Sequence, residues 1–166
     1  MGMSKTFIGF DNGVSGSIGV ISESGYLFVP MPIKKQQNYT KAKKDINRID
    51  VLKLSTFFDQ YMIDSNAMVL IERPMVNPGR FQATMSAIRA LEAVIIFLES
   101  RYIPFNYIDS KEWQRELLPK GAEKEELKRL SADIGRRLFP LAEETINKQK
   151  DADGLLIAEY CRRKFS

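Results

Sequence analysis

The sequence predicts a single α/β domain, spanning residues 1–166, with a mixed β-sheet. Three observations support this. Short apolar runs separated by turn residues stand near the start, a long amphipathic segment covers residues 83–101, and strand-like and helix-like segments alternate between them. A chain of 166 residues is long enough to bury one sizeable core. Such an alternation is typical of a sheet covered by helices.

The first part of the chain is predicted to form an antiparallel meander. Apolar residues occupy 6–11, 17–21 and 26–29, and the short segments between them are rich in Asn, Ser and Gly. These residues favour tight turns. Residues 34–48 follow as a polar, basic segment that reads as a mobile loop. Its net charge is +5, from one acid, Asp45, and six cations: Lys34, Lys35, Lys41, Lys43, Lys44 and Arg48.

The remaining elements alternate between helix and strand. Helical spacing of apolar residues predicts helices at 49–63, 83–101, 123–139 and 151–163, and a short helix at 110–118 that Ser110 is expected to cap. Buried strands are predicted at 67–71 and 105–108. The sheet is therefore expected to hold five strands, three antiparallel and then two parallel, flanked by helices.

Composition excludes several kinds of site. The chain has no histidine and one cysteine, Cys161, which rules out a Ser-His-Asp triad, a His-ligated zinc site and an intrachain disulfide. Chemistry is left to carboxylates, lysines, hydroxyls or a hard metal ion. The net charge of +4 suits a nucleic-acid partner and is equally common in basic proteins without one.

Nothing in the sequence predicts export or a membrane partner. No secretory apolar region follows Lys5, and the longest uninterrupted apolar run, residues 93–98, is too short to span a bilayer. These features predict a cytoplasmic protein.

Acidic residues stand where predicted elements begin or end. Asp11 closes the first strand, Glu72 closes the fourth, and Asp151 and Asp153 open the last helix. If the first and fourth strands are parallel neighbours, Asp11 and Glu72 meet at one sheet edge. Bare carboxylates so close would repel, and Mg²⁺ ions would remove that conflict. Each acid alone also has a plain role, in an Asx-turn, a surface ion pair or a helix N-cap.

Three motifs resemble those of RuvC-type Holliday-junction resolvases. They are Ile8-Gly9-Phe10-Asp11-Asn12-Gly13-Val14-Ser15-Gly16, Val69-Leu70-Ile71-Glu72-Arg73-Pro74, and the run from Asp151-Ala152-Asp153 to Ala158-Glu159-Tyr160. The segments 110–113 and 136–140 resemble phage and organellar relatives. The resemblance implies a ribonuclease H-like fold and a Mg²⁺-dependent endonuclease that cuts branched DNA. A phage-like branch would imply a phage-encoded protein that acts in a bacterial host.

The resemblance also implies roles for individual residues. Asp11, Glu72 and Asp153 would be metal ligands for two Mg²⁺ ions, which Mn²⁺ can replace. The family's fourth ligand falls at Gln149 or Lys150, so Asp151 is the substitute. Lys111 would act at the scissile phosphate. DNA contacts would come from the basic segment and from Arg73, Arg80, Phe81 and Lys124. The helix over 83–101 would build a homodimer.

Other functions remain open at this stage. A flap or general branched-DNA nuclease of the same fold and a non-catalytic junction-binding module both fit the residues. An actin-like or sugar-kinase ATPase also has a strand ending in Asp-x-Gly, but it needs two such lobes and this chain has room for one.

Overall fold

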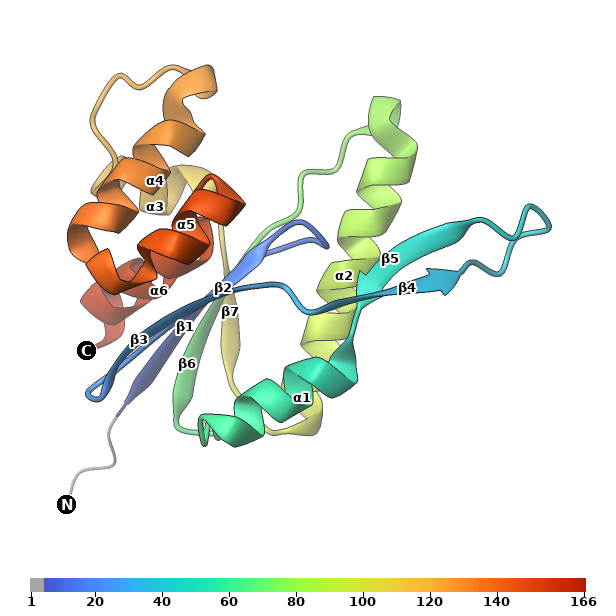
Figure 1. Cartoon of the computed structure of the whole chain (residues 1–166), viewed down its shortest axis with the longest axis horizontal. Helices are drawn as coiled ribbons and strands as arrows, with labels where there is room; N and C mark the ends of the chain where they lie inside the picture. The colour runs from blue at the N-terminus through green and yellow to red at the C-terminus, as the bar shows by residue number, and fades with distance from the viewer. Residues whose placement is uncertain (1–4) are drawn as a thin grey trace.

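The computed structural model describes residues 5–166 and contains a five-stranded mixed sheet (Figure 1). The strand order is β3-β2-β1-β6-β7. Strands β1 (Thr6–Asp11), β2 (Ser17–Ser22) and β3 (Gly25–Pro30) are antiparallel, and β6 (Ala67–Glu72) and β7 (Phe105–Ile108) continue the sheet in parallel beside β1. The predicted α/β architecture, with three antiparallel strands and then two parallel ones, is confirmed.

Helices cover both faces of this sheet (Figure 1). On one face lie α1 (Val51–Gln60) and α2 (Phe81–Ser100). On the other lie α3 (Ser110–Leu117), α4 (Leu127–Leu138), α5 (Glu143–Gln149) and α6 (Asp153–Phe165). Short 3-10 turns precede three of the helices: Pro78–Arg80, Lys124–Glu126 and Pro140–Ala142.

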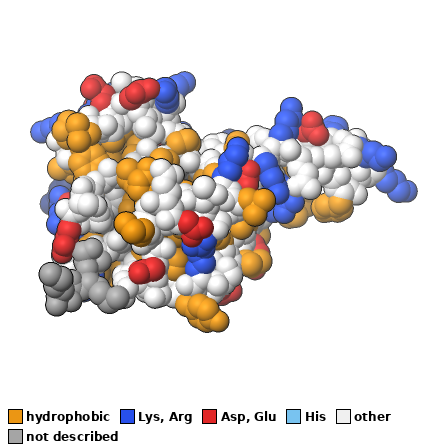
Figure 2. Space-filling view, turned by 60° about the horizontal axis from the view of Figure 1, so that its bottom comes forward, with side chains coloured by type: hydrophobic (Ala, Val, Ile, Leu, Met, Phe, Trp, Pro, Cys, Tyr) orange, Lys and Arg blue, Asp and Glu red, His pale blue; other side chains and the backbone are white. Residues whose placement is uncertain are grey.

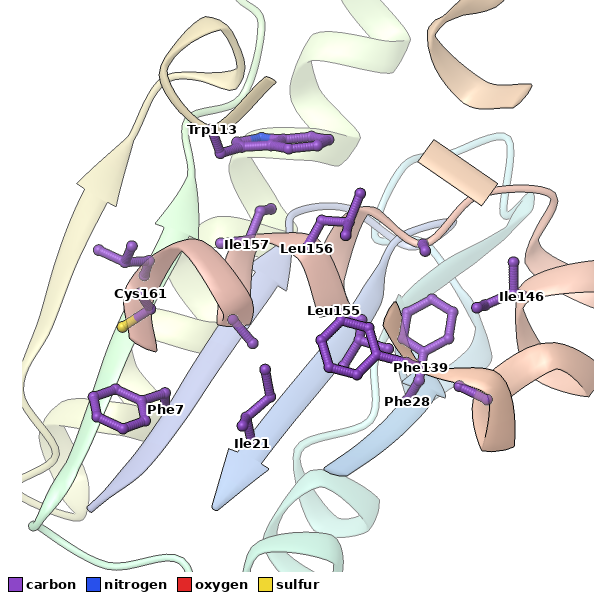
Figure 3. Packing of buried hydrophobic residues seen from close by; sticks show 14 of the residues in the cluster. Phe7, Ile21, Phe28, Trp113, Phe139, Ile146, Leu155, Leu156, Ile157 and Cys161 are labelled. Atoms are coloured by element: carbon purple, nitrogen blue, oxygen red, sulfur yellow. The ribbon is translucent and has the colours of Figure 1, made fainter. Parts of the chain in front are cut away.

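Alternation along β1 divides the core into two layers. Ile8 and Phe10 pack with Phe58 of α1 on one face, whereas Phe7 belongs to the cluster that surrounds α6 on the other. Figure 3 shows this second cluster, in which Leu155 points down to the sheet and Trp113 lies above the helix. A strand buried on both faces is what a continuous apolar run predicts.

Helix α6 rests directly on the backbone of the sheet at three glycines. A Cβ atom at Gly9 would lie 2.3 Å from the Gly154 carbonyl oxygen, and one at Gly19 would lie 2.3 Å from Leu155 Cα. Real Cβ atoms essentially never approach so closely, so a side chain there would lift the helix. The start of α6 is therefore held against β1 and β2.

The basic segment is an ordered hairpin and not the predicted loop. Strands β4 (Ile33–Gln37) and β5 (Asp45–Ile49) pair antiparallel and project from the body beside α2 (Figure 1). We call residues 33–49 the arm. The loop prediction was wrong because polar side chains on both faces hide the strand signal that alternation normally gives.

One smaller prediction was also wrong, and one helix was missed. Helix α3 is capped by Asp109, within a capping box with Glu112, and Ser110 is already its first residue. Helix α5 was not predicted, because a helix of seven largely polar residues has no apolar stripe to detect.

One helix passes a length-and-composition test for a membrane span. The most apolar 18-residue window within Pro78–Ser100 has a mean hydropathy of 1.5, and only 28% of that window is buried. The uninterrupted apolar run, residues 93–98, is much shorter than this window. Small and polar residues interrupt the window but lower its mean hydropathy only slightly. Core helices pass the same test, so the finding is weak evidence for a membrane. It identifies α2 as a helix with unusually exposed apolar surface.

Candidate metal-binding active site

The sheet register places two acids side by side. In the parallel pair β1–β6, Phe10 lies opposite Ile71, so the next residues, Asp11 and Glu72, lie at the same strand ends. The expectation that the first and fourth strands of the main sheet are parallel neighbours is confirmed. Carboxyl ends of parallel strands are where ligands collect in α/β sheets.

Helix α6 brings two further acids to this edge. Carboxylate oxygens of Asp11, Asp151 and Asp153 all lie within 4.8 Å of one another. They line an open cavity of about 390 Å³, together with Asn12, Lys128 and other residues of the β1–β2 turn and the start of α2. Glu72 lies close enough for its charge to act on Asp11 and Asp153.

Burial and mutual repulsion make these carboxyls reluctant to ionise. Burial, followed by repulsion from Asp153 and Glu72, raises the pKa of Asp11 well above its ordinary value. Burial and the neighbouring Asp151 raise the pKa of Asp153 from 3.8 to about 7. Burial also raises the pKa values of Glu72 and Asp151. A cluster of this kind favours a partner that supplies positive charge.

Hydrogen bonds from neighbouring elements fix the orientation of the acids. The indole nitrogen of Trp113 donates to Glu72 Oε2 at 2.7 Å, and the Ser131 hydroxyl donates to Asp153 Oδ1. The same Ser131 oxygen accepts from the Ala152 amide at 3.0 Å. Helices α3 and α4 thus aim one acid each, although neither helix contributes an acid to the cluster.

A surface ion pair and a helix N-cap, the alternatives to metal binding for Glu72 and for Asp151 or Asp153, account for these acids only in part. Arg73 pairs with Asp109 at 3.3 Å, and no ion pair joins it to Glu72 within residues 5–166. The N-cap residue of α6 is Ala152, although Asp151 Oδ1 does accept from the Asp153 amide at 3.2 Å. Neither contact requires carboxylates to be buried together.

The residues of the cavity fit a hard divalent cation. The metal ligands that its acids can offer are all carboxylate oxygen atoms, the ligand type that Mg²⁺ prefers. Asn12 Oδ1 is also buried without a hydrogen-bond partner in the described part of the chain, while Asn12 Nδ2 donates to the Ala87 carbonyl at 3.1 Å. A cation, or water bound to it, would satisfy both the repelling acids and this oxygen.

The lysine that reaches the cavity is not one that the sequence singled out. Lys128 Nζ lies 3.9 Å from Asp151 Oδ2, and Lys128 lines the cavity. Lys111 lines a different pocket beside α3, and Lys124 is exposed one turn before Lys128. No sequence pattern singles out Lys128: it shares a face of α4 with Ser131, because i and i+3 lie together on a helix, and only the packing of α4 brings that face to the acids.

Gln149 and Lys150, where the family resemblance implied a fourth ligand, do not line the cavity. Lys150 ends α5 in the left-handed conformation, with φ 66°, and Gln149 Nε2 donates to the Gly16 carbonyl at 3.4 Å. Asp151 therefore occupies the cavity in their place.

The loop after Glu72 is exposed and partly apolar. Phe81 is 64% exposed at the start of α2, and Met75 and Val76 are exposed beside it. Arg73 lies over the Tyr107 ring at 5.6 Å, whereas Arg80 forms no ion pair within residues 5–166.

Comparisons with known proteins identify the fold. No family model matches, and no curated protein matches. Among solved structures, Thermus thermophilus RuvC in complex with a Holliday junction substrate is similar, with a TM-score of 0.62 and 13% identity over 97% of this chain and 96% of that one. Another Thermus thermophilus RuvC structure has a TM-score of 0.54 and 16% identity, over 98% and 97% of the two chains. The chain has the ribonuclease H-like fold of RuvC.

Proposed function

We propose that this protein is a Mg²⁺-dependent endonuclease that cuts branched DNA, with four-way junctions as its main substrate. The observation that carries the proposal is the oxygen-only cluster of Asp11, Asp151 and Asp153, beside Glu72, at the strand ends of a RuvC-like sheet. The chain is similar over nearly its whole length to a protein solved with a Holliday junction, and this similarity supports the choice of substrate.

In this proposal the four acids hold two Mg²⁺ ions, which Mn²⁺ can replace. When bound, such ions activate water and stabilise the leaving oxygen in phosphodiester hydrolysis. The water attacks in line with the leaving group: it gives up a proton as its oxygen bonds to phosphorus, and the bond from phosphorus to the 3′ oxygen breaks. That oxygen takes up a proton, which leaves a 3′-hydroxyl and a 5′-phosphate.

A lysine is proposed to neutralise negative charge that develops on the phosphate. Lys128 is the best placed, since it lines the acidic cavity. Lys111, favoured by the family resemblance, stands at the start of α3, just after β7, and lines a different pocket.

DNA binding is proposed to involve the exposed cations around the site. Phosphate contacts release counterions and supply sequence-independent affinity. The proposed set is Lys34, Lys35, Lys41, Lys43 and Lys44 of the arm, Arg73 and Arg80 of the loop after Glu72, and Lys124. Phe81 is proposed to pack against unstacked bases at the branch point, for which its exposure leaves it available.

A homodimer fits both the proposed task and α2. Cutting a four-way junction symmetrically requires two sites. Met85, Ile88 and Ile96 leave apolar side chains exposed along α2, and a second copy of this helix is the proposed partner. The phage-like branch of the family remains a proposal that no structural feature supports.

The test is cleavage of a labelled four-way junction, with linear duplex and flap DNA as controls. Paired symmetric nicks that require Mg²⁺ and disappear in EDTA, in Asp11→Asn and in Asp153→Asn are expected. Equal cutting of flaps would indicate a general branched-DNA nuclease. Tight junction binding without cutting in Mg²⁺ or Mn²⁺ would refute the enzyme and leave a binding module.

A further inference from the structure

The two faces of the arm carry different charge. Lys34 lies directly opposite Arg48 in the β4–β5 register, so both side chains stand on one face. On the other face Lys35 Nζ lies 3.8 Å from Asp45 Oδ2. The single acid of the arm thus compensates a cation on one face and leaves two opposed cations on the other.

This opposition costs stability in the free protein. Like charges directly across an antiparallel pair are destabilising. Arg48 Nη1 donates to Gln36 Oε1 at 2.7 Å, which holds the guanidinium along the face without neutralising it. Neither Lys34 nor Arg48 forms an ion pair with any residue of the described chain. A face of this kind is suited to a polyanion.

The tip of the arm is an ordered turn. Asn38 Oδ1 accepts from the Thr40 amide at 3.1 Å and from the Thr40 hydroxyl at 2.7 Å. The Asn38 amide donates to the Lys44 carbonyl at 2.8 Å. This turn presents Tyr39, which is 93% exposed, among three lysines that form no ion pair within residues 5–166: Lys41, Lys43 and Lys44.

The cations follow the length of the arm. A strand rises about 3.3 Å per residue, so the charges spread over more than ~10 Å between Lys34 and the tip. Figure 2 shows Lys and Arg side chains along the projection and at its far end. An extended line of charge matches the regular phosphates of a duplex better than a compact acidic site. Tyr39 is the only large apolar side chain among residues 38–44, which disfavours a lipid surface.

We propose that the arm binds a double-stranded segment of the branched DNA away from the cleavage centre. The Lys34–Arg48 face and the tip lysines contact phosphates, and Tyr39 packs into the groove between them. A two-stranded ribbon fits the major groove, which is about 12 Å wide. The arm leaves the body beside α2, on the side away from α4 and α6 (Figure 1). This inference rests on the proposed function for the identity of the DNA.

The test is equilibrium binding of the full chain to a four-way junction in EDTA, over a series of salt concentrations. Each lost phosphate contact reduces the magnitude of the negative slope of log K against log salt by about 0.9. Lys34→Ser/Arg48→Ser is therefore expected to lower it by roughly 1.8 and to weaken binding on the order of tenfold. Tyr39→Ser is expected to weaken binding without changing the slope, because it removes no charge.

A double variant of matched charge is the control. Lys148→Ser/Lys164→Ser also removes two cations, but these pair with Glu144 and Glu116, away from the arm. This variant is expected to keep the native slope, and thermal melting checks that every variant is folded.

The outcomes separate this inference from the proposed function. Junction cleavage by the native protein, with equal binding by the Lys34→Ser/Arg48→Ser variant, would overturn the role of the arm alone. Arm-dependent binding without cleavage in any metal would support the arm and refute the nuclease. Binding to phosphatidylserine vesicles, with no binding to DNA, would overturn both.

Discussion

Trp113 donates its indole N–H to Glu72 across 2.7 Å, and this bond joins a fully buried aromatic ring to the carboxylate that lies beside the acidic cluster. The hydrogen bond lowers the pKa of Glu72, against the larger effect of burial, which raises it. The indole therefore favours the ionised carboxylate that a metal requires and fixes which of its oxygens stays free.

Trp113→Phe is expected to weaken metal binding while the fold is kept. The change removes the donor and preserves much of the packing above α6. Partners of this kind are worth about 10–100-fold in metal affinity. The Mg²⁺ concentration for half-maximal junction cleavage should rise by such a factor, and so should that for half-maximal thermal stabilisation by Mg²⁺.

Phe58→Leu is the matched control for this change. Phe58 is equally buried, but on the opposite face of the sheet. It should lower the melting temperature and leave the Mg²⁺ requirement unchanged. An unchanged Mg²⁺ requirement in Trp113→Phe would show that the hydrogen bond is merely structural.

The stability of the metal-free protein should fall as pH rises from about 4 to about 7. The pKa of Asp153 is 3.8 ordinarily and about 7 in the folded protein, so in this window the folded state holds a proton that the unfolded chain has released. Unfolding is measured in EDTA at several pH values. Asp153→Asn should flatten this dependence and stabilise the metal-free protein above pH 7.

Added Mg²⁺ should reverse the effect at high pH. A ligand that binds only the folded state stabilises it, and it competes with the proton for these carboxyls. The Asn variant should gain less from Mg²⁺. A pH-independent free energy of unfolding in the native protein would contradict the raised pKa.

Lys128→Gln should reduce cleavage more than Lys124→Gln does. Lys128 lines the acidic cavity, whereas Lys124 is an exposed residue of the preceding turn. Removing a donor at the reacting phosphate typically lowers kcat by about 100- to 1000-fold. Single-turnover rates at saturating protein separate this loss from weaker binding. Equal rates for the two variants would exclude Lys128 from the chemical step.

Ile88→Glu is expected to dissociate the proposed dimer. A charge at the centre of the exposed apolar surface of α2 would have to be buried in the interface without a partner. Leu52→Glu, on the exposed surface of α1, is the control. Sedimentation equilibrium should give a monomer for the first variant only. A native protein that sediments as a monomer would refute the dimer.

Elements that bury a regular pattern of apolar residues were predicted correctly, whereas elements held by backbone bonds and polar side chains were missed. Buried strands such as β1 and β6 carry apolar runs with a turn or an acid at the end, and these were located within a residue or two. The arm was missed because its pairing is held by backbone bonds and polar side chains on both faces. Helix α5 was missed because it is short and largely polar, so it has no apolar stripe.

The acids of the candidate site could be predicted from the sequence, but the residues that hydrogen-bond or pair with them could not. Asp11 and Glu72 end adjacent parallel strands, which the order of elements implies. The bond from Trp113 to Glu72 joins residues 41 apart, and no local pattern encodes such a contact. Lys128 and Ser131 share a face of α4, but only the packing of that helix shows that the face meets the acids.

The direct seating of α6 on the sheet separates two kinds of mutational constraint. Gly9, Gly19 and Gly154 set the height of the helix, whereas Asp151 and Asp153 at its start, with Asp11 at the end of β1, are the proposed metal ligands. In a saturation library selected only for folding, the three glycines should be retained while Asp11 and Asp153 drift to neutral residues. Selection for metal retention would hold both sets, so comparing the two pools would distinguish the residues that build the scaffold from those that use it.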